Sequence, residues 1–306
     1  MIVAETATGE SRITTWRDIA IIAVVGIVVR AIFLQLAGAW GAPHLWEYDL
    51  IADNMLAGRG FVHDYRDIEY YTFTTPGWPF VLSVLLRIGD YRLVQCFQIL
   101  MCVLLGASAY AVARNTWGRR AGLFAGVSCV LHPGLVYYSV MNSDPLPLNA
   151  LVVFLIAAAL LRLARTPGSV NAVLVGVLIG GSMLTRGTTV LLLPVGAVWL
   201  LFSVGWRRMA WSITIMLLTS SAIVTPWLLR NLAVVNAPVI TSTSGEMLWW
   251  GNNPNASGGI EAVDGSHMRS WVPPAVLSVV ESSPSELVHN QTFRNEALRF
   301  IWSNPM

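Results

Sequence analysis

The sequence predicts an all-α polytopic membrane protein, because its composition is strongly apolar and its apolar residues gather into runs long enough to cross a bilayer. Of the 306 residues, 55% are hydrophobic and 12% are charged, whereas a soluble domain has about 25% charged residues. A helix needs about 20 mostly apolar residues to cross the hydrocarbon core, and about seven segments approach this length. We therefore expect a bundle of about seven transmembrane helices.

The expected spans cover residues 19–36, 93–113, 121–140, 146–163, 171–185, 189–204 and 209–229. The first run resembles a signal peptide, since residues 37–39 are Ala-Gly-Ala. It is long for a signal peptide, Arg30 interrupts it and more spans follow, so we expect a retained anchor. Residues 78–86 form an apolar run that is too short to span, and we expect a juxtamembrane or re-entrant helix there.

The arginines predict the orientation of the spans, because short cytoplasmic loops retain positive charge. Threading the spans alternately places the arginines of the amino-terminal segment and of three short connections on one side. They are Arg12, Arg17, Arg114, Arg119, Arg120, Arg162, Arg165, Arg207 and Arg208. We therefore expect a multi-pass protein of the cell (plasma) membrane with a cytoplasmic amino terminus. The loop at residues 41–91, the turn at residues 142–144, the turn at Arg186 and the chain after Arg230 then face outward.

The chain is expected to divide into two parts. Residues 1–230 form the transmembrane module, in which residues 41–91 are the first extracytoplasmic loop with interfacial helices. Residues 231–306 contain clusters of Gly, Asn, Ser and Pro, which predicts a small mixed extracytoplasmic tail of short strands or loops with a helix near residues 285–302. Residues 300–306 resemble the beginning of a further helix, so we expect this segment to be truncated.

Charge and cysteine content exclude several classes of protein. A formal net charge of +2 gives no basis for nucleic-acid binding. Cys96, Cys102 and Cys129 lie in expected membrane helices without CxxC spacing, so neither a disulfide framework nor a zinc site is expected. The histidines show no ligand spacing such as HExxH. We predict no metal site and no cofactor, and the sequence leaves dependence on a divalent metal open.

The segment LWEYDLIADNMLAGRGF, residues 45–61, is the most informative part of the first outer loop. Tyr48, Ile51, Ala52 and Met55 recur at helical spacing, and Gly58 is placed to end the helix. This pattern predicts an amphipathic helix at the membrane surface. Its carboxylates are Glu47, Asp49 and Asp53. They either form a solvated acidic face or include a general base, which requires a partly desolvated group near a substrate hydroxyl.

Charged residues near other membrane boundaries each have two readings. Arg186 is expected at the outer end of an apolar helix, where it either holds a phosphate through forked hydrogen bonds or extends to the interface. Arg230 either contacts the same phosphate or anchors the last span. Asp144 either contacts substrate or caps the helix that begins near Pro145. Arg30 lies within a span, where a charge is unfavourable, so it should face other helices or a polar cavity.

Short motifs occur in order along most of the chain. They are Glu47 with Ile51-Ala52 and residues 56–61 (LAGRGF), residues 75–79 (TPGWP), His132-Pro133 with Ser143-Asp144, residues 184–186 (LTR), and Thr225-Pro226-Trp227 with Arg230-Asn231 and residues 251–254 (GNNP). Together they resemble the GT-C glycosyltransferases, in the branch that contains the protein O-mannosyltransferases and the aminoarabinose transferases that modify lipid A. That family usually has an aspartate followed by a glutamate in the first outer loop, and here Glu47 is the best positional match, with Asp49 second.

The resemblance implies a GT-C-like bundle and an inverting transfer of a sugar from a polyprenyl-phosphate donor to a hydroxyl of a lipid, glycan or protein acceptor on the extracytoplasmic side. It implies that Glu47 or Asp49 takes the acceptor proton and that Arg186 and Arg230 hold the donor phosphate. The candidates for substrate contacts are Asp144, Tyr71, Asn252 and Asn253, although the two asparagines also suit a simple loop. The implied partners are the donor, the acceptor and the lipid bilayer, without nucleic acid.

Two other classes of function remain open from the sequence. A transporter or lipid flippase should place ionisable groups near the midplane, within broken helices and paired repeats, and only Arg30 has such a position. A membrane scaffold, or an inactive fragment of a transferase, is also compatible with a chain that stops before further spans.

Overall fold

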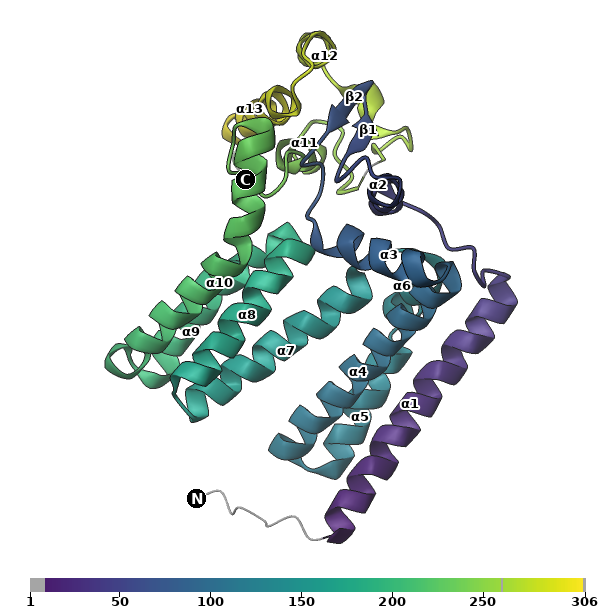
Figure 1. Ribbon diagram of the computed structural model, residues 1–306, viewed down its shortest axis with the longest axis vertical. Coiled ribbons are helices and arrows are strands. Elements are labelled where there is room, and N and C mark those ends of the chain that lie inside the picture. The colour runs from purple at the N-terminus through teal and green to yellow at the C-terminus, as the bar shows by residue number, and fades with distance from the viewer. Residues whose placement is uncertain (1–8, 260, 305–306) are drawn as a thin grey trace. The chain divides into compact units, whose positions relative to one another are not determined.

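The computed structural model describes residues 9–259 and 261–304. The α-helices in this part of the chain are α1 (Gly9–Ala37), α2 (Glu47–Leu56), α3 (Gly77–Ile88), α4 (Tyr91–Trp117), α5 (Arg119–Leu131), α6 (Pro133–Met141), α7 (Leu146–Arg165), α8 (Ser169–Thr185), α9 (Leu192–Val204), α10 (Trp206–Val235), α11 (Ser244–Gly251), α12 (Pro274–Ser282) and α13 (Glu286–Ser303). Figure 1 also shows strands β1 (His63–Tyr65) and β2 (Ile68–Tyr70). The 3-10 helices are η1 (Gly187–Leu191) and η2 (Met268–Trp271). The predicted stretch 300–306 begins inside α13, and its last two residues lie outside the described part.

The all-α polytopic membrane fold is confirmed, and each of the predicted spans is helical. Among the described residues, five helical segments are long and apolar enough to cross a bilayer: Thr14–Ala37, Tyr91–Trp117, Leu146–Arg165, Gly187–Val204 and Met209–Val235. The pair α5 and α6 makes a sixth if it is one bent span, while α8 has 17 residues and belongs with the shorter apolar helices. Length and composition therefore support five or six spans rather than seven. The run at residues 78–86 lies in α3, which is also short.

The break between α5 and α6 has a local chemical cause. Pro133 has no backbone N–H and disfavours a helical conformation in the preceding residue, so α5 ends and α6 begins with a bend of 44°. The break frees the carbonyl of Val130. Arg30 in α1 donates from Nη1 to that oxygen at 2.8 Å and from Nε to Ser139 Oγ in α6 at 2.9 Å. Arg30 is 0% exposed, so the prediction that it faces other helices is confirmed.

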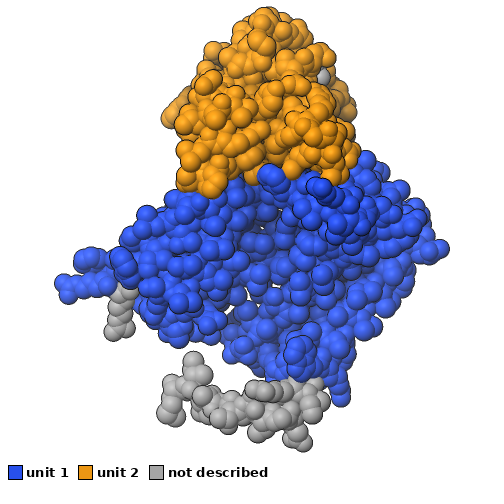
Figure 2. Space-filling view, in the orientation of Figure 1, with its two compact units in different colours: residues 1–49, 77–224 blue, residues 50–76, 225–306 orange. Residues whose placement is uncertain are grey.

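The chain forms two compact units, neither of which is continuous in sequence (Figure 2). Unit 1 contains residues 1–49 and 77–224, and unit 2 contains residues 50–76 and 225–306. Helices α2 and α10 contribute residues to both units. The long apolar helices up to Val224 therefore belong to unit 1, while most of the first outer loop groups with the tail.

The arginine-bearing connections lie at one end of unit 1. Figure 1 shows the start of α1, the α4–α5 connection, the α7–α8 connection and the α9–α10 connection at the same end of the helices. Side-chain contacts agree, because Arg119 at the start of α5 binds Asp18 in α1 through two hydrogen bonds of 2.7 Å. We call this the arginine end of unit 1. Its opposite end carries the α1–α2 segment, the α6–α7 turn and the α8–η1 turn.

Close helix packing holds unit 1 together where small residues allow it. Ile22 in α1, Tyr110 in α4 and Val130 in α5 are all 0% exposed and form one core cluster. Gly106 in α4 lies beside this cluster, and a Cβ there would meet Val130 Cγ1 at 2.5 Å. Only a glycine therefore permits this approach of α4 and α5.

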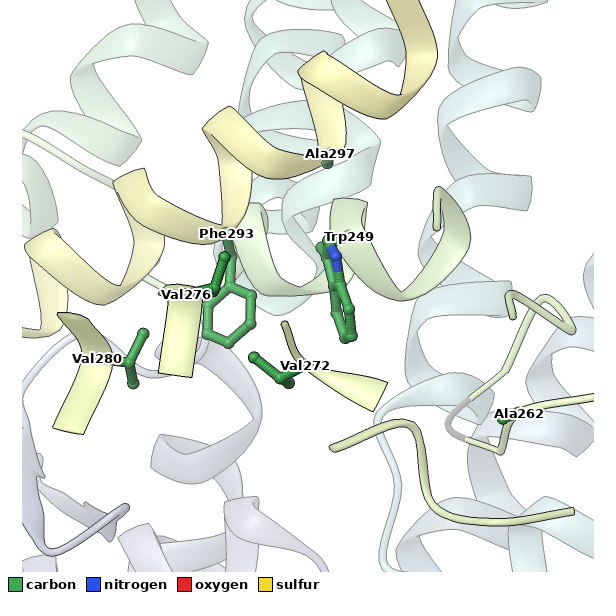
Figure 3. Packing of buried hydrophobic residues seen from close by; sticks show 7 residues of the cluster. All are labelled: Trp249, Ala262, Val272, Val276, Val280, Phe293 and Ala297. Atoms are coloured by element: carbon green, nitrogen blue, oxygen red, sulfur yellow. The ribbon is translucent and has the colours of Figure 1, made fainter. Parts of the chain in front are cut away.

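Unit 2 has its own apolar core. Trp249 of α11 lies against Phe293 of α13, with ring centroids 5.6 Å apart, and Val276 and Val280 of α12 complete the cluster (Figure 3). The helix predicted near residues 285–302 is thus present as α13. Strands β1 and β2 pair antiparallel through a turn at Arg66 and Asp67, both with positive φ, which is the backbone twist that two-residue hairpins require.

Buried carboxylates fix the polar interior of unit 2. Glu286 at the start of α13 accepts hydrogen bonds from the backbone N–H groups of Tyr71 and Thr72 and from Ser242 Oγ. Glu246 in α11 pairs with Arg66 at 2.5 Å, with both side chains at most 5% exposed. A buried charge needs such partners to be stable. These contacts tie the first outer loop to the tail within one unit.

Candidate active site

Two glutamines of α4 position the outer segments of unit 1. Gln95 Nε2 donates to the carbonyls of Ala39 and Val140, and its Oε1 accepts from the N–H of Gly41. Gln98, nearly one turn further along α4, donates to the carbonyls of Tyr138, Asn142 and Asp144. Both side chains are 0% exposed. The segment before α2 and the α6–α7 turn are therefore held against the same helix.

The segment before α2 also pairs directly with the α6–α7 turn. The His44 N–H donates to the Met141 carbonyl at 2.7 Å, and the Ser143 N–H donates to the His44 carbonyl at 3.0 Å. Trp46 Nε1 donates to Asn142 Oδ1 at 3.3 Å. This short bridge brings Glu47 and Asp144, far apart in sequence, to the same end of unit 1.

Glu47 and Asp49 have different surroundings although both stand in the first turn of α2. Asp49 is 0% exposed, and its Oδ2 accepts the backbone N–H of Trp46 at 2.8 Å. Asp49 is the third residue of the helix, and this hydrogen bond to the residue before the helix is one of the two bonds of a capping box, which stabilises the helix start. Glu47 is half-buried. Burial raises its pKa, and the negative charges of Asp144 and Asp49 raise it further, whereas a hydrogen bond from its own backbone N–H opposes them.

Asp144 lies in the α6–α7 turn, outside the spans. Its Oδ1 accepts the N–H of Leu146 at 2.7 Å, so it caps α7, as one of its two readings required. Burial raises its pKa, while the Leu146 hydrogen bond and the positive charge of Arg186 lower it. The electrostatic interactions thus run from Glu47 to Asp144 and from Asp144 to Arg186, all within unit 1.

Arg186 occupies the turn between α8 and η1. Its backbone N–H donates to Ser182 O, and its carbonyl accepts from Thr189, so the backbone is fixed while the side chain is exposed. Within residues 9–259 and 261–304, its guanidinium makes no hydrogen bond or salt bridge. The backbone of this turn is fixed and the N–H groups of the Arg186 guanidinium are available as donors, which suits the binding of a phosphate.

Arg230 and Tyr71, the next two sequence candidates, lie in unit 2 and contact each other. Arg230 donates to the carbonyls of Tyr71 at 2.5 Å and Phe61 at 3.2 Å, and to Asn231 Oδ1 at 2.9 Å. It also stacks on Trp227, with its Cζ 4.9 Å from the ring centroid. The Tyr71 hydroxyl donates to Glu69 at 2.6 Å. Arg230 therefore joins residues 61–71 to the end of α10.

Asn252 and Asn253 are engaged with the end of α11. The Asn252 side chain donates to the Leu248 carbonyl, and the Asn253 side chain donates to the Trp249 carbonyl, both at 2.8 Å. Asn253 is 4% exposed and also accepts the N–H of Asn255. The two side chains therefore stabilise the end of α11 and the turn that follows it, which is the structural role that the sequence also suggested for them.

Several polar residues near the outer end of unit 1 were missed by the sequence reading. Six of the buried polar atoms that have no hydrogen-bond partner in the described part of the chain come from α3, α4, the α6–α7 turn, α7 and α8 of unit 1: Trp78 Nε1, Gln98 Oε1, Asn142 Nδ2, Ser143 Oγ, Asn149 Oδ1 and Ser182 Oγ. Native proteins satisfy nearly all such atoms, so a group of them needs an explanation. The available signal was the pair of amides Gln95 and Gln98 inside an otherwise apolar span, since polar residues in spans are commonly functional.

The described residues contain no group of three or more His, Cys, Asp or Glu side chains arranged to hold a metal ion. Glu47, Asp144 and Arg186 place carboxylates and a guanidinium at the end of unit 1 opposite the arginine end. This set is suited to accepting a proton from a hydroxyl and to binding an anion.

Comparison with known proteins gives one match. The family model described as dolichyl-phosphate-mannose-protein mannosyltransferase matches residues 74–229, just over half of the chain. The matched stretch contains Asp144 and Arg186, while Glu47 and Asp49 precede it. Searches of the curated proteins and of the solved structures found no match.

Proposed function

Because the chain belongs to the dolichyl-phosphate-mannose-protein mannosyltransferase family, we propose that it transfers a sugar from a polyprenyl-phosphate donor to an acceptor hydroxyl. The family consists of membrane glycosyltransferases that use lipid-linked sugar donors, and the apolar helices agree with a multi-pass membrane protein. The acceptor is a lipid, a glycan or a protein. The motifs of the first outer loop and of the Leu184-Thr185-Arg186 turn favour the branch of protein O-mannosyltransferases and aminoarabinose transferases.

The observation that carries this proposal is the electrostatic chain from Glu47 through Asp144 to Arg186. A transfer from a phosphate-linked sugar needs a base for the acceptor hydroxyl and positive charge for the leaving phosphate. Unit 1 supplies both kinds of group at one end. A membrane position suits this arrangement, since the lipid tail of the donor stays in the bilayer while its phosphate reaches the interface.

Glu47 is the proposed general base. Its raised pKa makes it a stronger proton acceptor than an ordinary glutamate. Asp49 is committed to the Trp46 N–H, so it is assigned to positioning Glu47. In a single displacement, the acceptor oxygen bonds to the anomeric carbon as the bond from that carbon to the phosphate oxygen breaks. The acceptor proton passes to Glu47, and attack from the face opposite the phosphate inverts the anomeric configuration.

Arg186 is the proposed ligand of the donor phosphate. The phosphate leaves as an anion, so it needs positive charge rather than a proton, and a guanidinium offers two parallel donors to it. Arg230 is already bound by three acceptors in unit 2, so we assign the phosphate contact to Arg186 alone.

The proposed location is the plasma membrane, with the arginine end of unit 1 in the cytoplasm. Short loops with several arginines are retained on that side. The end that carries Glu47, Asp144 and Arg186 then faces outward, where a lipid-linked donor and a secreted or surface acceptor meet.

The test is transfer of radiolabelled sugar from polyprenyl-phosphate donors in membranes that contain the wild-type protein or a variant. Glu47→Gln should lower turnover by at least about 10²-fold, the usual contribution of a general base. Asp49→Asn should have a smaller effect, because the amide oxygen can still accept the Trp46 N–H. The matched control is Asp53→Asn, which removes an exposed carboxylate from the same helix and should leave turnover unchanged.

Two outcomes would overturn the proposal. Full turnover by Glu47→Gln would remove the proposed base. Movement of labelled lipid between leaflets without formation of a glycosidic bond would indicate a flippase instead of a transferase.

A further inference from the structure

A pocket of about 390 Å³ lies at the arginine end of unit 1, between the last turns of α4 and α7. This is the end of the helices opposite to the candidate active site (Figure 1). None of the residues assigned to sugar transfer lines it. The pocket therefore needs a separate explanation.

The lining of the pocket changes from apolar to polar along the helix axes. On α7, Ala158, Leu161, Arg162 and Arg165 follow helical spacing and share one face. On α4, Val112 precedes Asn115 and Thr116 on the lining face. Ala158, Leu161 and Val112 thus form the part nearer the middle of the span, and the polar residues lie toward the helix ends. A lipid in a leaflet has the same order, with its acyl chains toward the middle and its headgroup outward.

Within the described residues, the two arginines of the pocket have no carboxylate partner. Arg162 and Arg165 are both exposed, and in the part of the chain that the structure describes neither guanidinium has a hydrogen bond or a salt bridge. Asp18, a carboxylate at the same end, is already bound by Arg119 and Tyr110. Two neighbouring guanidinium groups without a carboxylate favour an anion with several oxygen acceptors.

We propose that this pocket binds the phosphodiester headgroup of an anionic glycerophospholipid. Arg162 and Arg165 bind the phosphate oxygens through forked hydrogen bonds, and the apolar wall of Ala158, Leu161 and Val112 contacts the first carbons of the acyl chains. Basic pockets between membrane helices commonly recognise acidic headgroups in this way. The apolar wall favours a lipid over a free phosphate ion, since a free ion gains nothing from it. The inference is independent of the proposed transferase activity.

The test is lipid binding by the purified full chain, measured by native mass spectrometry with phosphatidylglycerol or phosphatidylcholine of identical acyl chains. The wild type should prefer phosphatidylglycerol. The double variant Arg162→Gln/Arg165→Gln should bind it about thirtyfold more weakly, since each arginine near a membrane surface contributes a factor of about five. The matched control is Arg120→Gln/Arg207→Gln, which removes two exposed arginines from the same end outside the pocket and should keep wild-type binding.

Further arms separate a lipid from a free anion. Millimolar inorganic phosphate should not displace phosphatidylglycerol from the wild type. Ala158→Leu, which fills the apolar wall without changing charge, should weaken lipid binding while the melting temperature stays near that of the wild type. The proposal is overturned if the control double variant loses as much binding as the pocket variant, if the two lipids bind equally, or if inorganic phosphate displaces the lipid.

Discussion

Glu47 and Asp144 are each less acidic than an ordinary carboxylic acid for the same main reason, which is burial. They differ in what else surrounds them. Asp144 has the positive charge of Arg186 and the Leu146 N–H to stabilise its anion, whereas Glu47 has two neighbouring carboxylates that disfavour its anion. Two carboxyl groups in such contrasting surroundings are suited to different tasks.

The first residue-scale prediction concerns the pH dependence of transfer. Asp144→Asn removes a negative charge near Glu47, so the Glu47 pKa should fall and its carboxylate should form at lower pH. The acid limb of the kcat/KM profile should therefore move toward lower pH. The asparagine oxygen can still cap α7. Asp53→Asn is the control and should leave the limb in place, and a limb that moves to higher pH in Asp144→Asn would contradict the assignment.

The second residue-scale prediction separates the two candidate arginines. Arg230→Gln should lower the stability of the protein by about 2 kcal/mol or more, because hydrogen bonds to a charged group contribute about 1.5–3 kcal/mol each and Arg230 makes three. Arg186→Gln should leave the melting temperature nearly unchanged and lower kcat/KM for the donor at least tenfold, since one anion-stabilising donor contributes about 10²–10³. Thermal melting and donor kinetics on both variants check this. The reverse pattern would assign the phosphate to Arg230.

At the scale of elements, the start of α3 depends on one glycine. A Cβ at Gly77 would lie 2.7 Å from both the Leu184 carbonyl oxygen and Thr185 Cγ2 at the end of α8. That end leads directly into the turn of Arg186. The contact places the Thr-Pro-Gly-Trp-Pro motif directly against the Leu-Thr-Arg motif.

We therefore predict that Gly77→Ala forces α3 away from α8. The expected result is a loss of about 1–3 kcal/mol in stability, as for other overpacked contacts, together with reduced transfer. The control is Gly181→Ala, which lies in α8 with nothing within 4 Å of its added Cβ and should be neutral or stabilising by up to about 1 kcal/mol. Melting curves and transfer assays on the pair would measure this, and equal behaviour of the two variants would disprove the contact's importance.

The prediction of helices from the sequence succeeded where the apolar runs were long. Helices α1, α4, α7 and α10 follow such runs. The break between α5 and α6 was missed because residues 121–140 stay apolar through Pro133. Hydropathy does not reflect that proline has no backbone N–H to continue a helix. The β1–β2 hairpin was missed because Arg66 and Asp67 take positive φ without the glycine or asparagine that normally indicates such a turn.

Only some features of α2 could be predicted from the sequence. The termination at Gly58 was predicted, and its φ of 80° agrees. The capping role of Asp49 was hidden, since the N-cap residue is Trp46 rather than a serine or threonine. Spacing along the sequence also gives no reason to join Glu47 with Asp144 and Arg186. Their connection depends on Gln98 and on the His44–Asn142 bridge, which no local pattern contains.

At the scale of the whole chain, the grouping into two units is a property of long-range contacts. Glu286 binds Thr72 across 214 residues of sequence, and Glu246 binds Arg66 across 180. Each partner on its own is an ordinary polar residue in a loop or helix. The sequence therefore predicted most of the long apolar helices, while the grouping of residues 50–76 with the tail in unit 2 required the folded contacts.

The hydrogen bonds of Arg30 have a consequence for biogenesis. Gly26 O in α1 is one of its acceptors, but the other two, Val130 O and Ser139 Oγ, lie 100 and 109 residues later in the chain. The guanidinium of nascent α1 therefore lacks two of its partners and disfavours insertion by about 2.5–3.5 kcal/mol. We predict that an isolated α1 segment enters microsomal membranes less completely than its Arg30→Leu counterpart, while the same substitution in the full chain impairs assembly. Equal insertion of both isolated segments would disprove this. Stable insertion of α1 would then occur only after α5 and α6 have been synthesised, although α1 is the first helix of the chain.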